Sequence, residues 1–169
     1  MKGRTALSFC IAMTVTPSAA AAERDRCAEL APERAIACHV NAEREQHDRA
    51  PLRPSSVLAQ AAQGHAKDMV ARSYFAHVAP DGDGVGDRAR AAGYLRDRPR
   101  WWVGECLAWG TGSRGTPAGI VRMWMASPPH RRLVLSRRAR EVGIGLAEGA
   151  PQSVQGTGAV TVALALGAR

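Results

Sequence analysis

Apolar residues recur at helical spacing in the first half of the chain and at strand spacing near its end. The clearest helical stripe, from Leu58 to Met69, predicts a helix that begins at Ser55 or Ser56 and ends near Ser73. By contrast, the stretch from Val160 to Leu166 alternates apolar with small or polar residues, which is the period of a half-buried strand. Helices therefore precede strands along the chain.

Weaker patterns predict the remaining elements. Proline in the first turn of a helix costs no hydrogen bond, so Pro32, Pro117 and Pro128 indicate helix starts. The predicted helices cover residues 33–48, 87–92, 116–126 and a short segment from Ser127 onward, and the predicted strands cover 103–109 and 141–147. Helices followed by strands mixed with helices are typical of an α+β layered domain.

The first 22 residues have the pattern of an export signal. Lys2 and Arg4 precede an apolar stretch from Ala6 to Val15, and the small residues that end at Ala22 satisfy the Ala-x-Ala cleavage pattern. This apolar stretch is too short to cross a bilayer, which takes about 20 residues, and no other segment is long enough. We therefore predict a signal peptide over 1–22, a polar lead over 23–32 and one domain over 33–167, in a secreted or periplasmic protein without a transmembrane segment once processed.

The chain has a formal net charge of +8, and arginine supplies most of the positive charge. The densest cluster consists of Arg131, Arg132, Arg137, Arg138 and Arg140. Two interpretations stay open, a surface that holds an anionic cell-wall polymer or lipid headgroup, and a merely solvated face. Nucleic acid is excluded as a partner, because the chain is expected to be exported and lacks a basic motif interleaved with aromatic residues.

Three cysteines lie beyond the predicted signal peptide. We expect a disulfide between Cys27 and Cys38, because both lie near the start of the processed chain, with Cys38 to Cys106 as the alternative. No CxxC or Cys-His spacing indicates a structural zinc site.

The five histidines are the main candidates for chemistry. His65 lies on an apolar helical stripe and is expected to be buried and hydrogen-bonded, whereas His39 and His47 lie among charged residues and are expected at the surface. His77 and His130 lie in loop-like segments beside Pro and Gly signals, where binding groups concentrate. Their spacing alone does not show that they meet.

Several short motifs occur in a fixed order along the chain. They are His65-Ala66-Lys67-Asp68-Met69, Tyr74-Phe75-Ala76-His77, Pro80-Asp81-Gly82, Asp87-Arg88, Gly104-Glu105-Cys106-Leu107-Ala108, Trp124-Met125-Ala126-Ser127-Pro128-Pro129-His130-Arg131 and Glu141-Val142-Gly143-Ile144-Gly145. This set resembles the bacterial branch of the CAP superfamily of cysteine-rich secretory proteins, antigen 5 and pathogenesis-related proteins, over about residues 35–166. The resemblance implies an α+β fold, a three-layer α-β-α sandwich with a central, mostly antiparallel sheet.

The resemblance also implies a cleft whose two histidines and one acid map to His77, His130 and Glu105. Such groups hold zinc or another divalent metal, or transfer protons near neutral pH. Ser127 stands where many relatives carry a second acid, and we expect it to be the N-cap of the helix that follows rather than a nucleophile. Cys106 replaces the usual Asn, and a buried small residue, a disulfide partner and a soft metal ligand stay open as its role.

Three functions follow from the implied site. The first, favoured by the basic surface and the incomplete catalytic set, is a binding module for a lipid, cell-wall polymer or protein ligand. The second is a metal-dependent hydrolase or peptidase that uses His77, Glu105 and His130. In the third, the polar cluster only holds the layers of the fold together.

Overall fold

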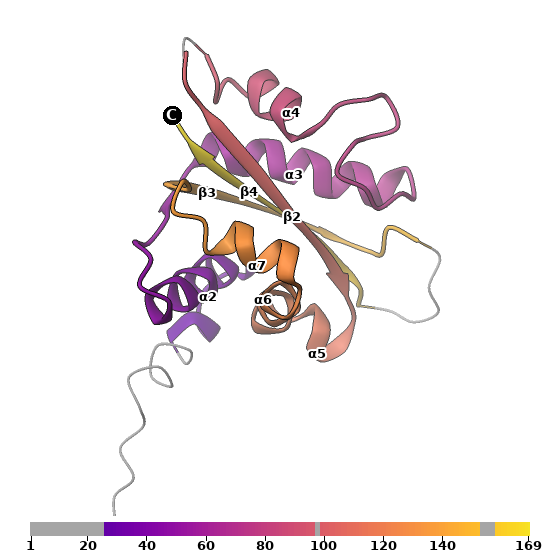
Figure 1. The fold of residues 1–169 in the computed structure, drawn as a ribbon. Helices are drawn as coiled ribbons and strands as arrows, with labels where there is room; N and C mark the ends of the chain where they lie inside the picture. Colours follow the sequence, from indigo (N-terminus) through magenta and orange to yellow (C-terminus); the bar gives the residue numbers. More distant parts are fainter. Residues whose placement is uncertain (1–25, 97–98, 153–157) are drawn as a thin grey trace, which may run out of the picture.

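The three predicted layers are present in the computed structural model, which describes residues 26–96, 99–152 and 158–169. α3 (Ser56–Ala71) and α4 (Val85–Ala91) cover one face of a central sheet, and α2 (Pro32–Gln46) lies with α6 and α7 on the other (Figure 1). The remaining elements are β1 (Arg53–Pro54), β2 (Trp102–Gly110), α5 (Gly112–Gly115), α6 (Pro117–Ala126), α7 (Pro128–Val134), β3 (Glu141–Glu148) and β4 (Val160–Ala168). The α+β sandwich expected from the sequence is therefore confirmed.

The sheet has four strands in the order β1-β3-β4-β2. β4 pairs antiparallel with both β3 and β2, and only the two-residue β1 is parallel to its neighbour. β2 lies at one edge of the sheet, with Glu105 opposite Ala165 of β4. This position leaves β2 accessible to the segments that pack over the edge.

Alternation along the strands divides the core into two parts, because successive side chains point to opposite faces of a sheet. Cys106 and Leu164 belong to the core under α2 and α6, whereas Leu107 and Ala165 belong to the core under α3. Glu105, two residues before Leu107, therefore faces the α3 and α4 layer.

The observed elements match the predicted ones closely, with two additions. β1 lies in the proline-containing segment 50–54, for which no element was predicted, and α5 is a single turn before α6. In the lead predicted over 23–32, residues 26–28 are helical and Cys27 is buried. The signal peptide predicted over 1–22 lies outside the described residues.

The expectation for His39 was wrong, because its side chain is buried. α2 packs against both β3 and α6, so more of its circumference is covered than its charged residues suggest. Arg44 on the same helix is also buried, and its Nη1 donates to the backbone carbonyls of Val134 (2.6 Å) and Ser136 (3.1 Å). Within the described residues, no helix is both long and apolar enough to cross a membrane.

Candidate functional site

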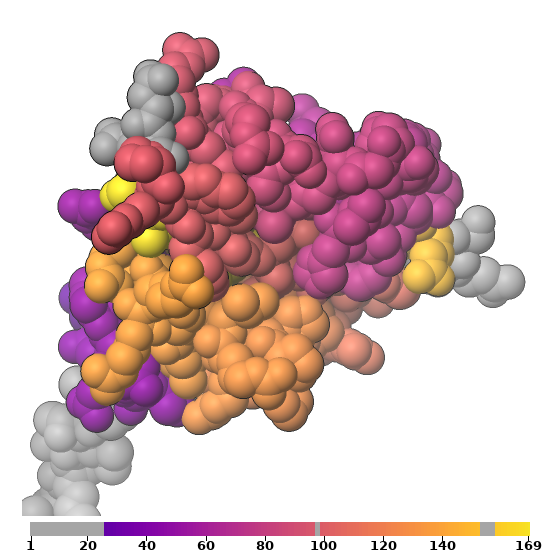
Figure 2. Space-filling model, turned by 45° about the horizontal axis from the view of Figure 1, so that its top comes forward, coloured from indigo at the N-terminus to yellow at the C-terminus, as the bar shows by residue number. Residues whose placement is uncertain are grey.

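Two segments that are remote in the sequence meet over the edge of β2. One is the connection 72–84 between α3 and α4, and the other is α7 with the end of α6. Phe75 from the first and His130 from the second line the same pocket. In Figure 2 the magenta surface of the first segment lies against the orange surface of the second along a shallow seam.

Glu105 is the centre of the polar cluster beside this seam. Its side chain is only 3% exposed, and both of its oxygens are engaged. Oε2 lies 2.8 Å from Nδ1 of His77, and Oε1 accepts a hydrogen bond of 2.8 Å from Nη2 of Arg88. A charge-assisted bond of this kind compensates the cost of burying a carboxylate.

Arg88 also fixes the connection between α3 and α4. Its Nη1 donates to the carbonyl of Asp83 (2.6 Å), and its Nη2 donates to the carbonyl of His77 (2.9 Å). One side chain therefore positions both the carboxylate of Glu105 and the backbone of the histidine that contacts it. Sequence reasoning missed this role, because no spacing pattern marks Arg88 apart from its place in the Asp87-Arg88 motif.

His65 reaches the cluster from α3 and is buried and hydrogen-bonded, as expected. Its Nε2 lies 3.1 Å from the carbonyl of Ala76 and 3.8 Å from Oε2 of Glu105. Its Nδ1 lies 3.3 Å from the hydroxyl of Tyr74, which donates a hydrogen bond of 2.5 Å to Asp68. Burial lowers the pKa of His65 despite the opposing charge of Glu105, so the neutral imidazole is favoured.

His130 is held by a different partner, the hydroxyl of Ser127. Its Nδ1 lies 2.9 Å from Ser127 Oγ, and its pKa is lowered by burial and, to a smaller degree, by the charge of nearby His77. Ser127 does occupy the N-cap position of α7, but its side chain caps no backbone N–H group. The expectation of a simple capping role is corrected, because the hydroxyl is used to orient His130.

The structure brings the three predicted site residues into one region, but only two of them, His77 and Glu105, are in direct contact. His77 contacts Glu105, whereas His130 is hydrogen-bonded to Ser127. The charge of His77 acts on His130 only at longer range, where it helps to lower the pKa of His130. Over the described parts of the chain, no group of three or more His, Cys, Asp or Glu side chains is arranged to hold a metal ion. A guanidinium cation already lies on Glu105, so these residues do not fit a three-ligand zinc centre.

The cysteines have separate structural roles. The structure joins Cys27 to Cys38 by a disulfide with Cα atoms 5.6 Å apart, and Cys106 is a buried free thiol. Burial raises the pKa of Cys106 to about 12, so it stays protonated at neutral pH. Of its alternative roles, a small buried core residue fits this position, since Cys106 packs with α6 residues in the core.

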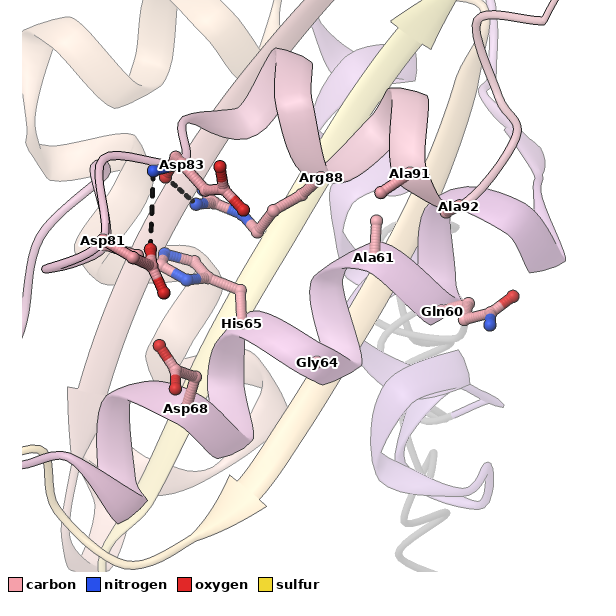
Figure 3. A pocket seen from close by; sticks show the side chains of 11 residues that line it. Gln60, Ala61, Gly64, His65, Asp68, Asp81, Asp83, Arg88, Ala91 and Ala92 are labelled. Carbon is pink, nitrogen blue, oxygen red and sulfur yellow. Dashed lines mark hydrogen bonds between the residues drawn. The ribbon is translucent and has the colours of Figure 1, made fainter.

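Two pockets flank the Glu105 cluster. The larger, of about 390 Å³, lies between α3 and α4. Its charged residues, among them Asp81 and Arg88, gather at one end, whereas Ala61 and Ala91 lie toward the other end, near Gln60 (Figure 3). The smaller, of about 210 Å³, is lined by Phe75, Leu107, Ala108, Trp109, Met123, Trp124, Ser127 and His130.

Acid is expected to destabilise the fold through His65 and His130. Both have a pKa below the ordinary value of 6.5, so the unfolded chain binds more protons than the folded one as the pH falls below 6.5. Their full contribution is present above pH 6.5 and is lost as the pH falls toward the lowered pKa values. Urea unfolding at pH 7.5 and 5.0 should show the lower stability at pH 5.0.

The stability of the double variant His65→Asn/His130→Gln should depend less on pH, because asparagine and glutamine do not titrate between pH 5.0 and 7.5. Equal stability of the unaltered protein at the two pH values would contradict the assignment of neutral histidines.

Comparison with known proteins places this site in a family. Residues 39–163 match the CAP family, described as the cysteine-rich secretory protein family. The chain is 28% identical over 135 residues to the uncharacterized protein YkwD of Bacillus subtilis (strain 168), a match that covers 80% of this chain and 46% of YkwD. This chain thus spans less than half the length of that curated relative.

Solved structures show the same fold. An extracellular protein of Bacillus anthracis that contains an SCP domain superposes with a TM-score of 0.64 at 22% identity, over 80% of this chain and 39% of that one. An outer surface protein of Borrelia burgdorferi superposes with a TM-score of 0.63 at 17% identity, over 79% of this chain and 90% of that one. With the match over residues 39–163, these observations show that the chain belongs to the CAP family of cysteine-rich secretory proteins.

Proposed function

We propose that this chain is an exported binding module whose ligand lies in the seam over the edge of β2. Export through the predicted signal peptide 1–22 is supported by the apolar stretch from Ala6 to Val15 and by neighbours described as extracellular and outer surface proteins. A disulfide is also typical of oxidising compartments.

The observation that carries the proposal is the pocket of about 210 Å³ beside His130. Six of its lining residues are apolar or aromatic, and its two polar side chains, Ser127 and His130, are hydrogen-bonded to each other. Ligand pockets combine mostly apolar walls with a few fixed polar groups in this way. Such a site takes a short aliphatic group and offers a hydroxyl and an imidazole to the polar head attached to it.

The polar cluster supports this function by keeping the seam in place. Glu105 and Arg88 fix the connection that carries both Phe75 and His77, and the His77 side chain remains 56% exposed beside the seam. The pocket wall that contains Phe75 is therefore held by buried ionic contacts, and the exposed imidazole of His77 is available to contact the ligand. The class of ligand that fits is a lipid-like amphiphile with a hydrogen-bonding head.

The four tryptophans of the chain provide an internal test. Trp109 and Trp124 line this pocket, whereas Trp101 and Trp102 line another. Titration with 1-octanol should shift the indole N–H signals of Trp109 and Trp124 saturably in NMR spectra and leave those of Trp101 and Trp102 in place. If no signal shifts saturably, or if all four signals shift equally, the proposed binding site is wrong.

Phe75→Ala should weaken octanol binding about fivefold, because about 1 kcal/mol of apolar contact with the pocket is lost. Val78→Ala is the matched control, since Val78 belongs to the same connection, is 56% exposed and does not line the pocket. Phe75 is itself 38% exposed, so its loss should not unfold the protein. Equal affinities of the two variants would contradict the placement of the ligand.

A further inference from the structure

A third, basic pocket of about 410 Å³ lies where β2 begins and β4 ends. Its lining residues are Arg100, Trp101, Trp102, Arg138, Arg140, Ala168 and Arg169. They come together because Trp102 pairs with Ala168 across the two strands, and the connection from α7 to β3 passes beside them. This pocket shares no lining residue with either pocket beside Glu105.

The positive charge of this basic pocket is poorly compensated. Among the described residues, neither Arg100 nor Arg138 forms an ion pair, and Nη1 of Arg140 donates only to the neutral carbonyls of Arg137 and Ala139. Arg169 lies 3.6 Å from Glu141, whose same oxygen also accepts a hydrogen bond from Tyr94. Within the described residues, these four guanidinium groups have a single ion-pair carboxylate, that of Glu141, which gives the concave surface an excess of positive charge.

The two tryptophans shape the pocket. The guanidinium of Arg138 lies 5.6 Å from the centre of the Trp102 ring, and that of Arg90 lies 6.0 Å from the ring of Trp101. Such cation–π stacking fixes the plane of the guanidinium and leaves its N–H groups free at the edges. Trp101 is 43% exposed, so a flat apolar surface lies open beside the charges.

We propose that this basic pocket binds the phosphate group of a phosphorylated polyol such as glycerol phosphate, either free or as the headgroup of an anionic phospholipid. Arginine forks bind phosphate oxygens in pairs, and a phosphate offers more acceptor oxygens to several guanidiniums than a carboxylate does. The volume of about 410 Å³ is larger than one phosphate ion requires, which leaves room for the esterified alcohol against the indole rings.

Titration with glycerol 3-phosphate tests the proposal. The indole signals of Trp101 and Trp102 should shift saturably while those of Trp109 and Trp124 stay in place, which is the opposite of the octanol result. The two proposals therefore fail independently. In 0.15 M NaCl, Arg138→Gln/Arg140→Gln should bind at least tenfold more weakly, and Arg138→Gln alone should show part of this loss without removing the backbone contacts of Arg140.

The matched control is Arg122→Gln/Arg132→Gln, which removes two exposed charges on α6 and α7 that do not line the pocket. It should change the affinity less than twofold. An equal loss in both double variants would overturn the proposal in favour of nonspecific charge attraction, and so would the absence of any shift at Trp101 and Trp102.

Vesicles distinguish the two sources of the phosphate. If protein bound to phosphatidylcholine vesicles with 30% phosphatidylglycerol is released by glycerol 3-phosphate, the lipid headgroup occupies the pocket. If the protein binds glycerol 3-phosphate but does not bind these vesicles, the ligand is a soluble phosphate ester. Binding to the vesicles that glycerol 3-phosphate does not reverse, and that Arg138→Gln/Arg140→Gln does not weaken, would contradict the pocket.

Discussion

Replacing Arg88 by methionine is expected to lower the free energy of unfolding by about 3 to 5 kcal/mol, the usual cost of removing one partner from a buried ion pair. The carboxylate of Glu105 would keep its contact with His77 but lose the guanidinium 2.8 Å from Oε1. The carbonyls of His77 and Asp83 would lose their donor as well. Urea unfolding at pH 7.5 measures the change.

A neighbouring arginine on α4 provides the control. Arg90 forms an ion pair with Asp87 in which both side chains are more than half exposed, so Arg90→Met should change stability by less than about 0.5 kcal/mol. Glu105→Gln in the Arg88→Met background should restore part of the loss, because no buried charge then remains. If Arg88→Met and Arg90→Met proved equally mild, the cluster would not hold the seam together.

The elements of this fold could be predicted from the sequence because their signals are local. Proline at Pro117 and Pro128 marks the starts of α6 and α7, and the apolar pattern from Val160 to Leu166 marks β4. The expectation that this strand is half-buried was wrong, because β4 lies between β3 and β2 and is buried on both faces. The two-residue β1 gives no such signal, since its pairing with β3 depends on a segment almost 90 residues away in the sequence.

The buried polar residues were harder to predict, because burial depends on which elements pack together. His39 is covered by the packing of α2, and Arg88 reaches Glu105 from 17 residues upstream in the sequence. A helical pattern shows which residues share a face but not how much of the helix is enclosed. For this reason the family resemblance located His77 and Glu105 together but gave no sign of the guanidinium of Arg88, which bonds both Glu105 and the carbonyl of His77.

The contact between Ser127 and His130 could have been found in the sequence. The N-cap residue and the third residue of the helix commonly bond to each other, as in a capping box. Here Ser127 and His130 have that spacing, and the contact joins two side chains rather than a side chain and the backbone. A histidine at this position of an N-terminal turn is therefore a useful signal of an oriented imidazole.

A second large effect is expected at Gly145 of β3, where Gly145→Ala should cost about 3 kcal/mol of stability. A Cβ atom there would lie 2.2 Å from the backbone carbon of Ala62 and from the backbone nitrogen of Gln63. Backbone atoms of α3 cannot rotate away from a methyl group as a flexible side chain does, so the helix itself must move. Urea unfolding measures this loss as a lower midpoint concentration, provided that the dependence of the unfolding free energy on urea concentration is unchanged.

The close approach of α3 to β3 is also what allows Gln63 to bond the strand. Its Nε2 donates to the carbonyl of Leu146 (2.7 Å), and its Oε1 accepts from the backbone nitrogen of Leu146 (3.1 Å). Because α3 also carries His65, a displaced helix would draw one imidazole away from Glu105.

Gly64→Ala tests the same helix without the clash, because no atom outside the adjacent residues and the backbone of α3 itself lies within 4 Å of its added Cβ. Alanine is the better helix former, so this variant should gain up to about 1 kcal/mol. If Gly145→Ala lowers the stability and Gly64→Ala raises it, then glycine is required at position 145 of β3 because it has no side chain. A loss in both variants of similar size would instead mean that α3 is sensitive to any added volume, and that its contact with β3 is not what positions the candidate site.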